Sequence, residues 1–147
     1  MDHALEILLK QAKDRENQAA IALNTANLEL DDYYKQLAQI EQYRLDYCQQ
    51  LVQRGMNGLT ASQYTHLNRF LTQLDETLAK QKEAEDHFKQ QVVSSEEHWQ
   101  EMRKDRRSYE WLLEKKRIER QRQADRLEQK QMDEFSSQAY ARSRRLM

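Results

Sequence analysis

Apolar residues recur every seven positions along the first third of the chain, on two parallel tracks. The tracks start at Leu5 and Leu9, and 12 of their first 14 positions are apolar or aromatic. The first track continues through Ala12, Ala19, Ala26, Tyr33, Ile40 and Tyr47. A seven-residue repeat sustained over several heptads is typical of a coiled coil. It predicts a long helix over residues 3–53. The small alanines on the first track would let a partner helix approach closely.

The same repeat resumes further along, on tracks that start at Leu67 and Leu71. Polar residues interrupt these tracks at Gln81, Glu85, Ser95 and Arg106. A polar residue at a seam position can fix the register of two helices at some cost in stability. The pattern predicts a second helix over residues 61–135, followed by a frayed tail at 136–147.

Both glycines of the chain lie in the stretch GMNGLTASQY, and there is no proline. Gly55 and Gly58 are expected to let the chain reverse, because glycine adopts positive φ without steric penalty. Thr60 and Gln63 have the spacing of a capping box at the start of the second helix. A flexible hinge between collinear helices is the alternative, but a hinge does not need a capping box. We therefore predict a turn at 54–60 between antiparallel helices.

The two predicted helices differ in length, so the second should extend past the first. If the turn centres near residue 57, the part of the chain after about residue 113 has no partner helix. The predicted fold is all-α, a single coiled-coil domain over residues 1–147: two long helices form an antiparallel hairpin, and the second, longer helix overhangs.

Composition supports helices and shows where charge collects. Charged residues make up 33% of the chain, yet the scarcity of glycine and proline argues against disorder. The net charge is −1, but residues 102–147 hold 14 basic and 8 acidic side chains. The overhang is thus basic. It is expected to be either a solvated helix face or a docking segment for an acidic partner. Binding of nucleic acid is less favoured, because residues 114–130 hold no aromatic side chain on which a base could stack.

Nothing in the sequence indicates catalysis or a metal site, and we expect no enzyme activity and no cofactor. Glu83 and His87 are one helical turn apart, but no second His or Cys lies at ligand spacing. Cys48 is the only cysteine, which excludes an internal disulfide and fits a reducing compartment. The N-terminal residues are neither a secretory signal nor a transmembrane helix, so we expect a cytoplasmic protein.

An aromatic group on the first helix has two interpretations. Tyr33, Ile40 and Tyr47 lie on the seam track, which favours core packing. Gln36, Ile40, Tyr43 and Tyr47 also form their own stripe. If that stripe is exposed, it would be an anchor surface for a partner.

Three segments resemble the FliJ family, soluble components of the bacterial flagellar type III export apparatus. The most specific is LEQKQMDEFSSQAYAR at 127–142, and the others are LTASQYTHLNRFLTQLDETL at 59–78 and KQLAQIEQYRLDYCQQL at 35–51. The resemblance implies an antiparallel coiled coil similar to the rotor stalk of F-type ATPases. It also implies a protein that hydrolyses nothing itself.

The same resemblance implies three kinds of partner at the flagellar base, on the cytoplasmic side of the inner membrane. These partners are a hexameric export ATPase, the membrane protein of the export gate and the export chaperones; no nucleic acid and no membrane insertion are implied. The residues that match the family's gate contact are Gln36, Ile40, Tyr43, Tyr47, Phe70 and Leu74. Thr77 and Gln81 stand at two further contact positions where Ala and His are expected.

The overhang supplies the candidate contacts with the ATPase ring. Arg117, Arg120, Arg122 and Arg126 would face acidic loops inside it. Two rival hypotheses remain at this point: the equivalent stalk of a virulence injectisome, and a coiled coil that binds nucleic acid through its basic tail.

Overall fold

The chain is all-α, as the heptad pattern predicts. The computed structural model describes residues 2–146, which form two helices, α1 (Asp2–Met56) and α2 (Ala61–Arg145), and no strand. The helices hold 55 and 85 residues. Both extend beyond their predicted C-terminal ends, at 53 and 135, and the turn shortens from 54–60 to 57–60.

Local hydrogen bonds explain both extensions. The backbone N–H of Asn57 donates to the carbonyl of Gln53 over 3.2 Å, and that of Leu146 donates to Arg142 over 3.3 Å. Helical bonding of this kind needs no partner helix, and no glycine or proline interrupts residues 136–145. The apolar repeat therefore underestimates the length of α2.

The turn has the expected cap, but only one of the two glycines has the expected role. The N–H of Thr60 donates to Oε1 of Gln63, and the N–H of Gln63 donates to Oγ1 of Thr60, both over 3.2 Å. This reciprocal pair is a capping box. Gly58 adopts a φ of 88°, whereas Gly55 lies within α1 without positive φ. The prediction for Gly55 is therefore wrong: the reversal depends on Gly58.

The two glycines should respond in opposite ways to replacement by alanine. Gly58→Ala is expected to lower the free energy of unfolding by about 1 kcal/mol or more, because alanine disfavours positive φ. Gly55→Ala is expected to raise it by about 0.5 to 1 kcal/mol, since alanine is the better helix former. An added Cβ meets no atom within 4 Å at either position. Urea unfolding followed by circular dichroism checks both values, and a loss at Gly55 would contradict the assignment.

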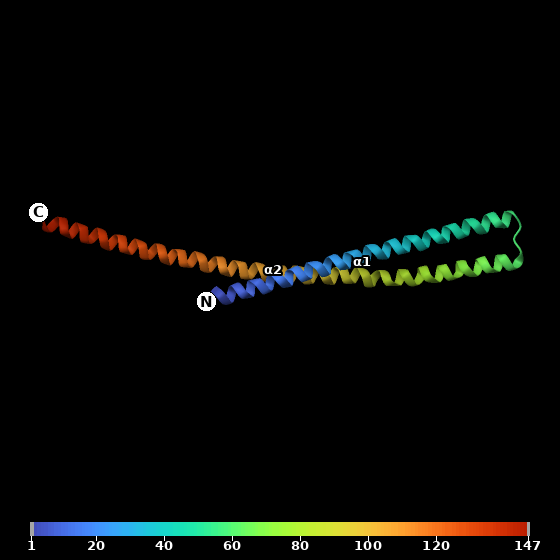
Figure 1. The fold of residues 1–147 in the computed structure, drawn as a ribbon, viewed down its shortest axis with the longest axis horizontal. Coiled ribbons are helices and arrows are strands. Elements are labelled where there is room, and N and C mark those ends of the chain that lie inside the picture. Colours follow the sequence, from blue (N-terminus) through green and yellow to red (C-terminus); the bar gives the residue numbers. More distant parts are fainter. Residues whose placement is uncertain (1, 147) are drawn as a thin grey trace. The chain divides into compact units, whose positions relative to one another are not determined.

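Contacts group the chain into two units, of which residues 16–101 form the first. Within this unit α1 and α2 run antiparallel on either side of the turn (Figure 1). Its buried residues are Ala19, Ala26, Tyr33, Leu67 and Leu78. All five lie on the predicted tracks, so the heptad pattern identifies the seam. Two of the five are alanines, whose small side chains allow a close approach of the two helices.

Two of the polar seam positions in this unit take part in hydrogen bonds between the helices. The hydroxyl of Tyr33 donates to the backbone carbonyl of Gln81 over 2.5 Å, and its ring stacks on Phe88 with centroids 5.2 Å apart. The hydroxyl of Tyr34 donates to Oε1 of Glu85 over 3.0 Å. Burial of the hydroxyl is the largest cause that raises the pKa of Tyr33, and the negative charge of Glu85 is the next largest. These bonds pin the register of the two helices.

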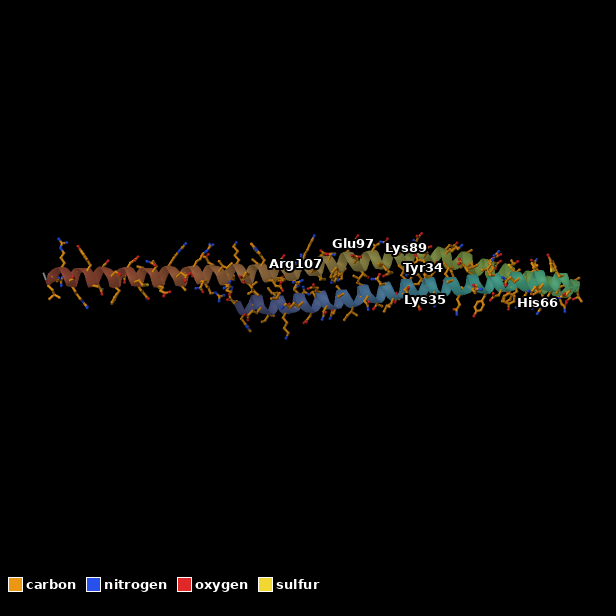
Figure 2. All side chains as sticks on the ribbon, turned by 90° about the horizontal axis from the view of Figure 1, so that it is seen from above. Tyr34, Lys35, His66, Lys89, Glu97 and Arg107 are labelled. Carbon is orange, nitrogen blue, oxygen red and sulfur yellow. The ribbon has the colours of Figure 1, made fainter. Side chains whose placement is uncertain are left out.

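The second unit holds residues 2–15 and 102–146. Ala12 is buried in it, again on the predicted track, and Asp2 forms an ion pair with Arg120 on α2. All residues from 114 to 146 are exposed. Figure 2 shows side chains along this C-terminal part of α2 projecting into solvent. The predicted overhang is therefore present within this unit, as a helix that ends at Arg145 rather than at 135.

Candidate functional site

The gate residues near the turn divide into exposed and half-buried side chains. Gln36 and Tyr43 are exposed, and Tyr43 leaves 52% of its surface open. Ile40, Tyr47, Phe70 and Leu74 are half-buried. The stripe on α1 is therefore neither fully seam nor fully surface. The two interpretations each hold for part of it, because α1 has no buried residue between Tyr33 and the turn, although Leu67 of α2 is buried there.

One aromatic pair brings the α1 and α2 parts of this patch together. The rings of Tyr47 and Phe70 lie with centroids 4.3 Å apart and planes tilted by 38°. Such a pair contributes about 0.5 to 1.5 kcal/mol beyond its buried area. Because both side chains are only half-buried, the pair presents an aromatic edge held by both helices. The geometry suits protein contact rather than chemistry.

An ion pair between the helices lies in the same part of the unit. Nε of Arg44 is 2.6 Å from Oδ1 of Asp75, and this hydrogen bond is the main cause that raises the pKa of Arg44. Both side chains are partly exposed, so the pair orients the helices more than it stabilises them. Arg44 and Asp75 also line a shallow hollow with Leu45 and Leu78.

The sequence patterns did not point to three exposed apolar residues before the turn: Leu45, Val52 and Met56, which are 53%, 62% and 83% exposed. Leu45 and Val52 are seven residues apart and belong to neither seam track. Their seven-residue spacing, away from both seam tracks, could have indicated from the sequence that these side chains lie outside the seam. These side chains enlarge the apolar surface beside the gate residues.

The two further gate positions, Thr77 and Gln81, take part in hydrogen bonds within the chain. The hydroxyl of Thr77 donates to the carbonyl of Gln73 over 2.9 Å, which is a local helix bond. Gln81 is half-buried and its carbonyl accepts the Tyr33 hydroxyl. Gln81 therefore has a role in the seam that needs no partner.

One helical turn after Gln81, charged side chains contact the exposed Tyr34. Figure 2 labels Tyr34 on α1 and Lys89 on α2, and Glu85 accepts bonds from both, over 3.0 Å from the tyrosine and 2.8 Å from the lysine. The bond from Lys89, followed by that from Tyr34, lowers the pKa of Glu85. This network links the two helices.

The four arginines proposed for the ATPase ring are not equivalent. Arg117 pairs with Glu114 on the same helix, with N···O distances of 2.7 Å and 3.1 Å. Arg120 pairs with Asp2 of α1. Within residues 2–146, no ion pair engages Arg122 or Arg126, and both are exposed. The side chains most accessible to an acidic partner are therefore Arg122 and Arg126.

Groups capable of chemistry remain scattered over the described part of the chain. No cluster of three or more His, Cys, Asp or Glu side chains that could hold a metal ion occurs between residues 2 and 146. Glu83 and His87 are exposed, and the His87 ring meets the edge of Phe88. Cys48 is a free, half-buried thiol. Neither described helix has a stretch apolar and long enough to cross a membrane.

Comparison with known proteins supports the resemblance of the segments. The family described as "Flagellar FliJ protein" matches residues 1–145. No curated protein matches the chain. Among solved structures, it is similar to a putative YscO homolog from Chlamydia trachomatis at 15% identity and a TM-score of 0.47, with 99% of this chain and 94% of that chain covered.

Proposed function

Because the chain belongs to the FliJ family, we propose that it is the stalk and coupling component of a flagellar type III protein export apparatus. The family match over residues 1–145 is the observation that carries this proposal. The proposal assigns the chain no reaction of its own. Its work is to bind, and to shift partner conformations by binding.

The basic end of α2 is proposed to enter the central channel of a hexameric export ATPase. Residues 114–146 are exposed and helical as far as Arg145, so they form an arm whose surface is open to a partner, with Arg120 paired to Asp2 of α1. Arg122 and Arg126 would meet acidic loops of the ring, while Arg117 and Arg120 shape the arm through their own ion pairs. A ligand shifts a conformational equilibrium only by its differential affinity. An arm with charge on selected faces can provide that difference between ring subunits.

The turn end is proposed to contact the cytoplasmic part of the export gate protein. The contact would use Gln36, Ile40, Tyr43, Tyr47, Phe70 and Leu74. The Tyr47–Phe70 pair supports this assignment, because it holds residues of both helices in one surface. Aromatic side chains are enriched among residues that dominate binding energy.

Two parts of the proposal concern cellular context. Empty export chaperones are proposed as further partners, escorted for reuse. The protein would work in the cytoplasm, at the periphery of the inner membrane beneath the flagellum.

Deletion of the gene tests the function directly. The expected result is loss of swimming and of flagellar protein secretion, restored by the wild-type chain expressed in trans. Normal swimming with lost effector secretion would instead assign the chain to a virulence injectisome. Normal swimming and normal secretion would contradict a role in export.

A further inference from the structure

The described residues include one exposed tryptophan, and it lies on α2 just before the basic arm. Trp111 leaves 61% of its surface exposed, and Ile118, two turns later on the same face, leaves 40%. Nζ of Lys115 lies 5.0 Å from the centre of the indole ring. Positions i, i+4 and i+7 share one helix face. Trp111, Lys115 and Ile118 therefore form one continuous surface, called the Trp111 face below.

This face is hollowed as well as apolar. The hollow is lined by Trp111, Glu114, Lys115, Ile118, Glu119 and Arg122. All six side chains belong to α2, so the hollow exists without any contribution from α1. The cation–π contact with Lys115 holds the lysine against the ring. The surface is thus partly preorganised.

Charge around the Trp111 face is mainly positive. Arg107, labelled in Figure 2, lies one turn before Trp111, and Arg122 and Arg126 lie three to four turns after it. Of the nearby acids, Glu114 pairs with Arg117, and Asp125 accepts a hydrogen bond from the side-chain amide of Gln121. Glu119 also lines the hollow and has no ion pair within residues 2–146. A partner segment of negative charge would therefore meet unpaired cations on both sides of an apolar centre.

We propose that the Trp111 face is the apolar anchor of the contact with the export ATPase, and that it binds an acidic segment of the ring carrying a large aliphatic side chain. This inference rests on the proposed function and adds the residues that determine affinity and specificity there. Arginines at an exposed rim steer association and select partners, whereas a desolvated tryptophan holds the complex together. A nucleic acid fits less well, because stacking platforms use successive aromatic residues and this face has one.

Affinity for the purified export ATPase provides the first test. Trp111→Ala in the full chain is expected to weaken binding about 30-fold, the loss typical of a central aromatic contact. Ile21→Ala is the matched control, since Ile21 is 65% exposed and lies in the other unit; it should bind like the wild type. Circular dichroism should give the same unfolding midpoint for the Trp111 variant and the wild type, because the ring is exposed. Equal affinities of the Trp111 variant and the wild type would overturn the inference.

Fluorescence provides a readout that does not depend on affinity. A Trp99→Phe variant leaves Trp111 as the sole tryptophan. Its emission should shift to shorter wavelength and its quenching by acrylamide should fall several-fold when the ATPase is added. Unchanged quenching in a complex that forms normally would refute the anchor but leave the proposed function intact. Failure of the wild-type chain to bind the ATPase would remove both, and quenching by an oligonucleotide at low salt would assign the face to nucleic acid instead.

Discussion

Reversing charge at both Arg122 and Arg126 is expected to weaken binding to the export ATPase by about 100-fold and to remove stimulation of its activity. Like charges placed opposite one another at an interface cost several kcal/mol, which exceeds the small gain of an exposed ion pair. These two positions give the sharpest test, because neither side chain pairs within residues 2–146. Titration of the Arg122→Glu, Arg126→Glu double variant against the ATPase measures the effect.

The matched control carries the same change in charge at the far end of α2. Arg144 and Arg145 are also exposed, and their replacement by glutamate alters the net charge equally. We expect that control to bind within a few-fold of the wild type. Equal losses in the two double variants would mean that the arm acts through overall charge, and no loss in either would contradict the arginine contacts.

Truncation of Tyr33 is expected to cost about 3 kcal/mol of unfolding free energy, the largest single effect on stability in this chain. Aromatic-to-alanine changes at buried positions typically cost 3 to 5 kcal/mol. Tyr33 is 3% exposed, stacks on Phe88 and donates to Gln81. Replacing Tyr33 by alanine leaves a cavity where the largest buried side chain of the seam was. Urea unfolding followed by circular dichroism measures the loss.

Two further variants separate the causes of that loss. Tyr33→Phe keeps the ring and should cost only about 1 kcal/mol, the net value of one hydrogen bond. Tyr43→Ala removes a tyrosine that is 52% exposed and should change stability by no more than about 0.5 kcal/mol. If Tyr33→Ala and Tyr43→Ala were equally stable, the seam would not be centred on Tyr33.

The seam and the turn were predictable because they depend on local and periodic signals. Each buried residue among those described, from Ala12 to Leu78, stands on a track read from the seven-residue repeat. The capping box needs only Thr60 and Gln63 at the correct spacing. The role of Gly55 was not predictable in this way, because a glycine before a turn can end a helix or continue it, and the backbone bonds around it decide.

Side-chain partners were less accessible to sequence reasoning. The pairing of Arg120 with Asp2 joins residues far apart in the chain and depends on register, which the repeat leaves open by whole heptads. The partial burial of Tyr47 depends on how far the helices separate near the turn, and Phe70 across the seam determines it. The exposure of Trp111 follows from the same geometry, because α1 covers only one face of α2.

Site-specific photo-crosslinking in cells tests the central claim most directly. A crosslinker at position 122 should capture the export ATPase and not the gate protein. A crosslinker at position 43 should capture the gate protein and not the ATPase. That result would place the turn region and the basic part of α2 on the two partners that the chain is proposed to couple. Capture of both partners from both positions, or of neither from either, would contradict the coupling role.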